Sequence, residues 1–386
     1  MKILLIDPVG TGHHQEYSTL LAEGLKTLGM QVYFFGSKPL VDSLISANLL
    51  EDGFPHAEMN VGRNFLKNEQ MRVHFFQEAM LVSRRIAPDI VHFLYMDHFL
   101  ISAVCSGLMA KRVGAVCATL HAIYFLPEFA PSFIYRMKGN IDFMMLRTLA
   151  SQGMRIMAHS ERVSNSLTKL TGMKQFDYIP YPVKSYMTDS DDKGMLRSKL
   201  RERLRLASMD VLLLVFGGTR RDKGADLAVK MLSLLPTRYH LLFAGKDTYF
   251  SRAFLTGLAS KLALNDRIHF DNRFIPEKDV PAYFYGCDIV LIPYRKTFSG
   301  QSGPLTIAAT LGVKIVAPDL TAFEETLSKY DLGCLYPVEN LALMADAVEK
   351  VEKLPPPAGF EKFRMEHGGP VFTGRVFESY NKTLHQ

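Results

Sequence analysis

Short aliphatic runs alternate with helix-like segments along this chain, and the alternation occurs twice. In the first half, the aliphatic run 2–7 lacks the period-2 pattern of half-buried strands, and residues 31–36 and 89–95 are further strand-like segments. Continuous aliphatic runs are typical of strands that are buried on both faces. Because short loops join these runs to the helix-like segments, we predict a parallel sheet that helices cover on both faces.

The alternation stops in the middle of the chain and then restarts. Residues 178–183 are Pro-rich, the polar and charged stretch that follows holds few core residues, and a new aliphatic run begins at residue 211. A chain of 386 residues suits two domains of roughly 150–200 residues each. We therefore predict an α/β fold with two Rossmann-like, doubly wound domains facing a cleft, formed by residues 1–185 and 200–365.

Charge and composition limit the classes of partner. The formal net charge is +6, which is mild for this length and fits an anionic ligand or loose attraction to an anionic membrane surface. Nucleic-acid binding is disfavoured because the cations are dispersed and no platform of aromatic and basic residues is visible. No apolar run reaches the roughly 18–20 residues that span a bilayer, and the apolar start of the chain is too short for a signal peptide. We expect a cytoplasmic protein.

Neither a disulfide framework nor a metal site is indicated. The four cysteines show no CxxC or Cys/His ligand spacing, and most lie in apolar runs, so we expect buried free thiols of a reducing compartment. The acidic stretch 189–192 lies in the predicted linker and reads as a solvated patch. The cysteines are Cys105, Cys117, Cys287 and Cys334.

Residues 216–226, FGGTRRDKGAD, leave a predicted buried strand through glycines and then place cations in a turn. Glycines allow close backbone approach to a ligand. Arg220 offers a bidentate fork and Lys223 a compact ammonium, which together suit a pyrophosphate. A solvated turn, with Asp222 and Lys223 near a helix N-terminus, is the alternative.

A second stretch, residues 288–319, runs from a strand through the loop SGQSG into a helix. Main-chain N–H groups at a helix N-terminus bind phosphate without side-chain charge. Ser302 could serve as the helix cap and as a ligand. A plain N-cap is the alternative for this stretch alone.

Taken together, the two stretches resemble the nucleotide-sugar glycosyltransferases of the GT-B fold, family 4 type. Many members have a strand followed by an FGxIRxYKG-like turn and, much later, PYxxxxxSG before a helix. The resemblance extends over nearly the whole chain, and its specific motifs lie in the second half. The matching positions are Phe216, Gly217, Arg220, Lys223, Gly224, Pro293, Tyr294, Ser302 and Gly303.

The resemblance implies roles for these residues. Arg220 and Lys223 would hold the donor diphosphate and neutralise the leaving group, while the Ser302–Gly303 backbone would grip the distal phosphate. The turn NRFIPEKD resembles the segment that packs against the nucleotide base, although an apolar strand end explains its residues equally well. The donor-binding residues expected on this basis are Gly12, Gly217, Phe274, Ile275, Ser299, Ser302, Gly303, Pro304 and Leu305.

One family feature is missing. Many members have a Glu-x7-Glu pattern around the phosphate-binding helix, in which one carboxylate contacts the donor sugar and the other the ribose. The corresponding positions here are Ser299 and Ile307. Recognition of the donor sugar and of the ribose must therefore differ from that of these members. Glu324 and Glu325 lie nearby in sequence, but we do not assign them as substitutes.

The first half is expected to supply the acceptor side. Its first loop contains Gly10 and Gly12, but position 15 is Gln, so the full GxGxxG pattern fails and a dinucleotide-binding function is disfavoured. The resemblance implies that His13, His14 and Glu16 line the cleft. A capped turn with solvated histidines is the alternative.

Further candidates follow later strands. The resemblance implies that His121, at the end of a strand, lies beside the reacting sugar, where a neutral imidazole can form a hydrogen bond; a core or rim histidine is the alternative. Asp97 and His98 follow another strand and could reach the acceptor. His159 fits a family pattern, and we expect Ser160 to be an N-cap.

The predicted function is transfer of a sugar from a nucleotide-diphosphate sugar to an acceptor hydroxyl. The resemblance implies retention of anomeric configuration, no metal or other cofactor, and a diphosphate whose growing charge is stabilised by fixed cations and amides. His121, Arg220 and Lys223 are the catalytic candidates, and no general base is nominated. A nucleotide-sugar epimerase and a non-catalytic nucleotide-sugar-binding subunit are the alternatives.

The acceptor could be a sugar, a lipid-linked molecule or a small molecule. The basic segments 63–76 and 135–149 could lie on a membrane where lipid-linked acceptors reside, although ordinary amphipathic core helices explain them too. In this fold the last helix often crosses back onto the first domain. Residues 366–386 could form such a helix or an ordinary final core helix.

Overall fold

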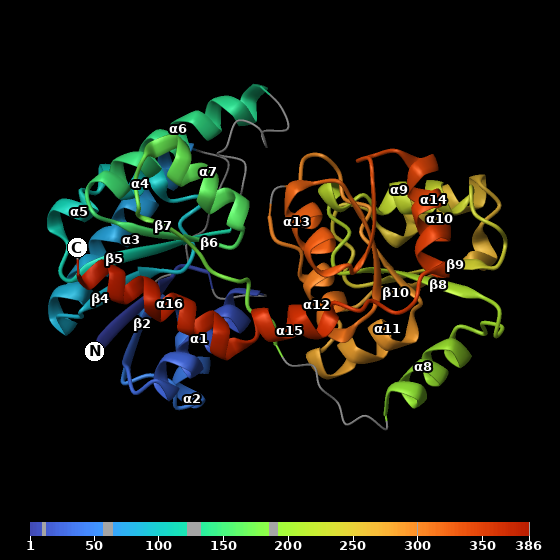
Figure 1. Cartoon of the computed structure of the whole chain (residues 1–386), viewed down its shortest axis with the longest axis horizontal. Coiled ribbons are helices and arrows are strands. Elements are labelled where there is room, and N and C mark those ends of the chain that lie inside the picture. Colours follow the sequence, from blue (N-terminus) through green and yellow to red (C-terminus); the bar gives the residue numbers. More distant parts are fainter. Residues whose placement is uncertain (10–12, 57–64, 122–132, 185–191, 299, 386) are drawn as a thin grey trace. The chain divides into compact units, whose positions relative to one another are not determined.

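The computed structural model describes residues 1–9, 13–56, 65–121, 133–184, 192–298 and 300–385. The chain forms two compact units (Figure 1). One comprises residues 1–184 together with 366–386, and the other comprises residues 185–365. The predicted pair of doubly wound α/β domains is confirmed by the two parallel sheets described below.

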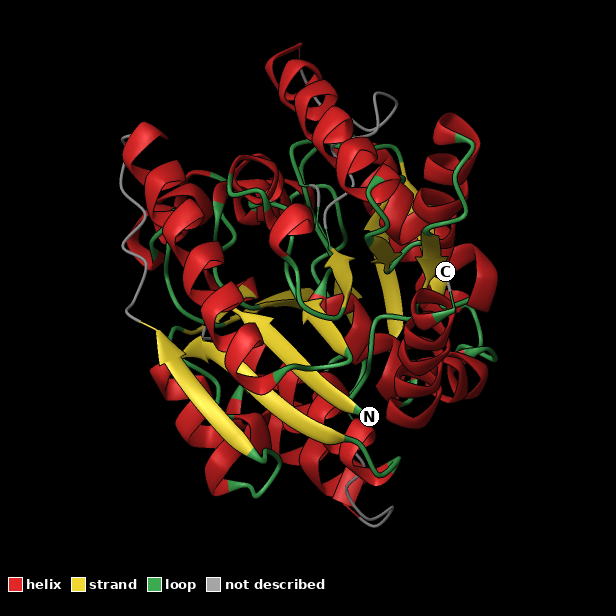
Figure 2. Ribbon diagram, turned by 90° about the vertical axis from the view of Figure 1, so that its left-hand side faces the viewer, coloured by secondary structure: helices red, strands yellow, loops and turns green. Residues whose placement is uncertain are grey.

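The first unit is built on a parallel sheet of seven strands in the order β3-β2-β1-β4-β5-β6-β7, counted over the described residues. Helices cover both faces of this sheet, as Figure 2 shows from the side of the first unit. The strands are β1 (Lys2–Asp7), β2 (Gln31–Ser37), β3 (Asp52–His56), β4 (Ile90–Phe93), β5 (Ala115–Leu120), β6 (Arg155–Ala158) and β7 (Phe176–Tyr178). The helices are α1 (His13–Thr27), α2 (Lys38–Ser46), α3 (Phe65–Ile86), α4 (Leu100–Cys105), α5 (Leu108–Lys111), α6 (Phe133–Ser151), α7 (Glu161–Thr171) and α16 (Gly369–Leu384).

The second unit contains a parallel sheet of six strands in the order β10-β9-β8-β11-β12-β13. Its strands are β8 (Val211–Phe216), β9 (Tyr239–Ala244), β10 (Ile268–Asp271), β11 (Ile289–Leu291), β12 (Lys314–Pro318) and β13 (Gly333–Tyr336). Its helices are α8 (Asp192–Arg203), α9 (Ala225–Leu232), α10 (Arg252–Lys261), α11 (Val280–Gly286), α12 (Gly303–Leu311), α13 (Thr321–Tyr330), α14 (Leu341–Lys353) and α15 (Phe360–His367), the last of which begins in this unit. Three short 3₁₀ turns are η2 (Arg221–Lys223), η3 (Asn265–Arg267) and η4 (Glu277–Asp279).

Local sequence signals explain the helix ends. Ser160 caps α7 by accepting a hydrogen bond from the Val163 amide at 3.2 Å, so the predicted N-cap is confirmed. The same helix ends at Gly172, which has a φ of 70°. A left-handed residue at this position is easily adopted by glycine and stops the helix.

The polar stretch between the domains is partly helical. Helix α8 packs on α11, and Arg197 and Arg201 form ion pairs with Asp288 at the start of β11. A domain boundary at residue 200 would divide α8, which belongs with the second unit from residue 185 onward.

Short edge strands were not apparent from the sequence. β3, β7 and β13 lie at sheet edges, and β3 includes Pro55, which cannot donate to a ladder. Only some of their residues are buried, and each strand is five residues or shorter. An edge strand that is covered on fewer sides does not need a continuous aliphatic run, so its sequence signal is weak.

Helix α16 packs on the first unit, against α1, β5 and β6 (Figure 1). The buried His92 ring of β4 joins it to the sheet: Nδ1 lies 2.7 Å from the Tyr380 hydroxyl and Nε2 lies 2.8 Å from Thr119 Oγ1. On the helix rim, Lys382 pairs with Asp177 at 2.9 Å. Residues almost 290 positions apart are thus held in one core.

This buried histidine makes stability depend on pH. Burial lowers the pKa of His92 to about 3, so the folded unit keeps the ring neutral where an unfolded chain, with a pKa near 6.5, takes up a proton. The stabilisation is complete above pH 6.5 and is lost as the pH falls toward 3. We expect His92→Gln to be less stable at pH 7 but to lose stability less steeply between pH 6 and 4, by about 1.4 kcal/mol per pH unit.

Denaturant unfolding at several pH values measures this difference. Tyr380→Phe is the matched control, because it removes the same hydrogen bond but leaves the titrating ring in place. In this variant the free energy of unfolding should change with pH as steeply as in the wild type. Equal slopes for His92→Gln and the wild type would contradict the assignment.

Two further expectations can be compared with the structure. All four cysteines are unpaired; Cys117, Cys287 and Cys334 are buried, whereas Cys105 is exposed, so the expectation of burial was wrong for that residue. It lies at the end of the six-residue helix α4, where only one face of the helix meets the core.

None of the helices in the described part of the chain has the length and apolar character required to cross a bilayer.

Candidate functional site

The two stretches singled out from the sequence follow neighbouring strands of the second sheet. β8 and β11 lie side by side, and the chain passes from β8 to β9 and β10 on one side before β11 begins on the other. The carboxyl ends of β8 and β11 therefore flank a topological switch point. In open α/β sheets, ligands bind at this place.

The turn after β8 packs directly on the segment that leaves β11. Gly224 has a φ of 61°, and a Cβ added there would lie 2.0 Å from the Pro293 carbonyl oxygen. Gly217 has a φ of 100°, and a Cβ there would lie 3.3 Å from Lys223 Nζ. Both positions favour glycine for backbone conformation, and position 224 requires it for space as well.

Lys223 is a cation that forms no ion pair with the described residues. Its Nζ lies 5.5 Å from the centre of the Tyr294 ring, a cation–π distance. Among the described residues, no carboxylate lies within ion-pair distance of this ammonium group. The side chain is half-buried. A partly desolvated cation without a carboxylate partner is suited to binding an anion.

Arg220 is placed differently. Its Nε donates to Asp222 Oδ1 at 3.0 Å and its NH2 group donates to Asp222 Oδ2 at 2.5 Å. This hydrogen-bonded carboxylate raises the pKa of Arg220. The guanidinium has five N–H donors, so an incoming anion can share it with Asp222. More than half of the Arg220 side-chain surface is exposed, at 58%.

Arg295 connects the two stretches and was missed by the sequence reasoning. Its NH2 group lies 2.6 and 2.7 Å from the carboxylate of Asp226 on α9. Its Nε donates to the Arg221 carbonyl at 3.1 Å and its main-chain N–H to the Asp222 carbonyl at 2.8 Å. The sequence signal that could have found it was a basic residue directly after Tyr294 in the second stretch. Arg295 fixes the backbone of the turn that carries Arg220 and Lys223.

The N-terminus of α12 forms the other side of this site. Ser302 caps the helix, as predicted: its Oγ accepts from the Leu305 amide at 3.3 Å and donates to the Tyr294 hydroxyl at 3.3 Å. Pro304 has no amide hydrogen, and the Leu305 amide is already used by the cap. A Cβ on Gly303 would have no atom within 4 Å, so a ligand has room at that position.

The turn after β10 places its two predicted residues differently. Phe274 is 67% exposed, with Lys246 Nζ 5.5 Å from its ring centre, whereas Ile275 is 7% exposed and packs inside the unit. Neighbouring strands are about 4.8 Å apart, and β10 is two strands from β8, so the two carboxyl ends lie about 10 Å apart. A nucleoside attached to a diphosphate spans a comparable length. Ser299 lies outside the described residues.

In the first unit, the candidate residues also follow strands at a switch point. β1 and β4 are neighbours, with β2 and β3 on one side and β5 to β7 on the other. The Asp97 carboxylate, after β4, accepts the main-chain N–H of His121, after β5, with both oxygens at 2.9 and 3.1 Å. His121 Nε2 donates to the Leu94 carbonyl at 3.0 Å.

Stacked rings hold His121 in place. The Tyr95 ring lies between the rings of His14 and His121, with centroids 3.7 Å apart on each side. His14 Nδ1 contacts the buried carboxylate of Asp7 at 3.0 Å, and burial raises the pKa of Asp7. The structure thus brings His14, Asp97 and His121 together at one edge of the sheet.

Other rings of this cluster were not singled out for function by the sequence. His159 lies 4.6 Å from His121 between ring centres, and burial lowers its pKa to about 3. Tyr17 and Tyr181 approach the same histidines. Glu16 is half-buried in the first turn of α1, and its charge contributes to raising the pKa of Tyr181. Gly12 lies outside the described residues, as does the side chain of His13, which begins α1.

Residues 210–353 match the family model described as "Glycosyl transferases group 1". This part of the chain is a glycosyltransferase domain. It contains the site around Lys223, Arg295 and Ser302. The resemblance on which the expected fold and enzyme class were based is therefore confirmed at this level.

Solved structures show the same fold over the whole chain. Sucrose-phosphate synthase from Thermosynechococcus elongatus has 16% identity and a TM-score of 0.78, with 100% of this chain and 99% of that chain covered. HepE from Anabaena in complex with UDP has 16% identity and a TM-score of 0.74, with coverage of 99% and 100%. WaaG, a glycosyltransferase involved in lipopolysaccharide biosynthesis, has 13% identity and a TM-score of 0.62, with coverage of 100% and 95%. No curated protein sequence matched the chain.

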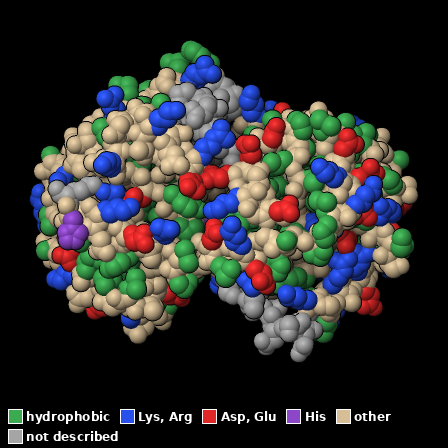
Figure 3. Space-filling view, viewed as in Figure 1, with side chains coloured by type: hydrophobic (Ala, Val, Ile, Leu, Met, Phe, Trp, Pro, Cys, Tyr) green, Lys and Arg blue, Asp and Glu red, His purple; other side chains and the backbone are tan. Residues whose placement is uncertain are grey.

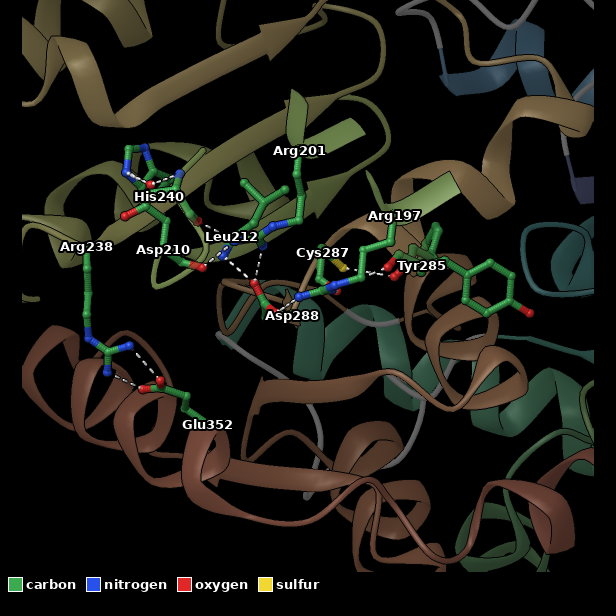
Figure 4. A network of polar contacts seen from close by, with 12 residues as sticks. Arg197, Arg201, Asp210, Leu212, Arg238, His240, Tyr285, Cys287, Asp288 and Glu352 are labelled. Carbon is green, nitrogen blue, oxygen red and sulfur yellow. Dashed lines mark hydrogen bonds and ion pairs between the residues drawn. The ribbon is translucent and has the colours of Figure 1, made fainter. Parts of the chain in front are cut away.

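The glycosyltransferase domain also has a cavity of about 410 Å³ at the opposite edge of its sheet. Its lining includes the first residues of three strands, Val211, Ile289 and Lys314. Several charged groups around it pair with one another (Figure 4): Arg238 binds Glu352 through two contacts of 2.7 Å, and Asp288 is held by the two α8 arginines. Lys314, which also lines the cavity, donates to the main-chain carbonyl of Glu352 at 2.7 Å.

Proposed function

We propose that this glycosyltransferase moves a sugar, of the hexose class, from a nucleotide-diphosphate sugar to an acceptor hydroxyl. The observation that carries the proposal is Lys223, a half-buried cation without a carboxylate partner among the described residues, at the carboxyl end of β8. It lies next to the Tyr294 ring, whose hydroxyl contacts the cap of α12. A diphosphate bound there would meet an ammonium group on one side and a helix N-terminus on the other.

The chemistry follows from the charge that develops. The bond between the anomeric carbon and the diphosphate oxygen breaks, and the departing diphosphate takes the electron pair. Lys223, the shared guanidinium of Arg220 and the Gly303 amide at the start of α12 would stabilise that charge without reorganisation. We propose retention without a metal, with the new glycosidic bond on the same face and the acceptor proton passing to the leaving phosphate oxygen.

We further propose a uridine-diphosphate sugar as donor. HepE from Anabaena, which shares the fold, has been solved with UDP and with UDP-glucose. The exposed ring of Phe274 offers a surface on which a base can stack, with Lys246 above it. Ile307 is half-buried in α12 and cannot bind a hydroxyl group. Sugar hydroxyls must be met by groups other than the usual pair of carboxylates.

The acceptor side is assigned to the first unit. We propose that His121, fixed by Asp97 and by the Tyr95 stack, is nearest to the reacting carbon, and that His13, His14 and Glu16 contribute to the acceptor surface. A glycoconjugate or polysaccharide pathway is consistent with WaaG, which is described as acting in lipopolysaccharide biosynthesis. We propose a cytoplasmic enzyme with peripheral contact to a membrane that carries lipid-linked acceptors.

Purified full-length protein tests the proposal with UDP, GDP and ADP and their glucose or mannose derivatives. We expect UDP to raise the unfolding temperature, since a ligand present at 100 times its Kd adds about 2.7 kcal/mol to stability. We also expect slow release of sugar from the UDP-sugar in water, with retention of configuration. Measurement is by thermal unfolding and by NMR of the released sugar.

Other outcomes separate the alternatives. Stabilisation by UDP without release or transfer of sugar, across a panel of acceptors, would indicate a binding subunit. Release of a sugar with inverted stereochemistry at a ring carbon would indicate an epimerase. Absence of stabilisation by any nucleoside diphosphate would contradict the site.

A further inference from the structure

Helix α6 has a row of large apolar side chains that the core does not cover. Phe133, Met137, Ile141 and Met144 are 73%, 54%, 47% and 61% exposed. Their spacing of four, four and three residues places them on one face of the helix. The opposite face is buried in the unit through Leu146, Leu149 and Ala150, among others. We call the four exposed side chains the apolar stripe of α6.

Basic side chains accompany this stripe. Arg136 and Arg147 are exposed on the same flank of the helix, three residues from Phe133 and from Met144. The only acidic residue of α6, Asp142, is 3% exposed and pairs with Lys138 at 2.6 Å. The exposed surface of the stripe therefore combines apolar area with uncompensated positive charge. Figure 3 shows hydrophobic and basic side chains together at the end of α6, at the top of the view.

The stripe projects beyond the sheet that α6 covers. A helix of 19 residues is about 28 Å long, whereas β6, which follows it, has four residues and spans about 13 Å. Because Ser151 leads within four residues into the amino end of β6, the first turns of α6 extend past the carboxyl edge of the sheet (Figure 1). His121 and Asp97 lie at that same edge.

We propose that the apolar stripe of α6 and its flanking arginines dock this protein on an anionic lipid surface. The four side chains would enter the boundary between head groups and acyl chains, and the arginines would pair with lipid phosphates. An acceptor held in the same membrane would then lie on the side where the proposed acceptor groups are. That last link rests on the proposed function, whereas lipid binding itself needs neither donor nor acceptor.

Charge favours a membrane over a second copy of the chain. In a two-fold dimer the same patch meets itself, so Arg136 and Arg147 would face their own counterparts. Like charges brought together in a desolvated interface are unfavourable, whereas an anionic head group neutralises them.

The other basic helix, α3, carries a weaker pattern. It exposes Leu66 and Leu81, but these are 15 residues apart and no continuous row joins them. Its Arg72 pairs with Glu69, and its His74 lies 3.1 Å from Glu78. Separated leucines are typical of a solvated helix face, so α3 serves as the comparison.

Sedimentation of the full chain with vesicles tests the proposal. We expect binding to phosphatidylcholine vesicles that contain about 30% phosphatidylglycerol, and weaker binding when salt is raised to about 0.5 M. Arg136→Gln with Arg147→Gln should weaken this binding by about 30-fold, since each basic residue near such a surface contributes about fivefold. Met137→Glu with Met144→Glu should weaken it by at least about tenfold.

Leu81→Glu in α3 is the matched control, because it charges an equally exposed side chain of the same unit. It should bind vesicles as the wild type does, and all variants should keep the stabilisation by UDP. If the wild type fails to bind anionic vesicles, or if Leu81→Glu is as damaging as the α6 variants, the proposal is overturned. A change in molar mass on charging the stripe, without any vesicle binding, would assign the stripe to a second copy instead.

Discussion

Replacing Lys223 by alanine is expected to lower turnover of the nucleotide sugar by about 10²–10³-fold. The range is that seen when one group that stabilises a developing negative charge is removed. Lys223 has no carboxylate partner among the described residues, so its charge is available to the diphosphate in the resting protein. Folding should change little, since the variant loses only the contact with the Tyr294 ring, worth about 0.5–1 kcal/mol. Initial rates and thermal unfolding with and without UDP measure both effects.

Two neighbouring arginines provide the comparison. Arg221→Ala removes the same charge from the same 3₁₀ turn and should leave turnover within about twofold, because a surface charge has a small effect. The loss of turnover in Arg220→Ala should lie between the losses in Lys223→Ala and Arg221→Ala, because Asp222 already pairs with the Arg220 guanidinium. Equal losses for Lys223→Ala and Arg221→Ala would show that only net charge matters and would refute the assigned site.

Replacing Arg295 by alanine is expected to reduce both stability and turnover. Asp226 is 7% exposed and would be left as a buried carboxylate without its main partner. Breaking a buried pair costs about 3–5 kcal/mol. Here Arg295 is partly exposed and Lys230 lies 4.0 Å from Asp226, so we expect about 2–3 kcal/mol. Turnover should fall because the Arg221 carbonyl loses the Nε–H donor that helps to fix the turn, whereas the main-chain hydrogen bond from position 295 to the Asp222 carbonyl remains.

A second variant separates these two effects. In Arg295→Ala combined with Asp226→Asn, the orphaned charge is removed, so more than half of the lost stability should return. Turnover should remain low, because the Arg221 carbonyl is still without the Nε–H donor of Arg295. Arg375→Ala, in the exposed pair with Glu378, should cost less than about 0.5 kcal/mol. Full recovery of turnover in the double variant would contradict a positioning role for Arg295.

Much of the fold was predictable because its signals are local. Continuous aliphatic runs indicated the central strands, and serines before helical segments indicated the caps at Ser160 and Ser302. Glycine at positions 217 and 224 indicated a turn, and the structure shows that both have positive φ. Each of these properties depends on a residue and its near neighbours in the chain.

The site was only partly predictable because its charges are matched by distant residues. The sequence placed Arg220 and Lys223 in one turn. It could not show that Asp222 pairs with Arg220, whereas Lys223 has no carboxylate partner among the described residues. The pairing of Arg295 with Asp226 joins positions 69 apart. The Tyr95 ring between two histidines likewise joins helix α1 to the segments after β4 and β5.

The two α/β domains, the glycine turns and the helix caps thus follow from local patterns, since these features arise from backbone preferences and from the spacing of apolar residues. Which cation is neutralised, which rings stack and which face of α6 is left uncovered depend on how the chain packs in three dimensions. Those properties depend on contacts between segments far apart in the chain. A pattern of apolar and charged residues does not specify which of them will meet.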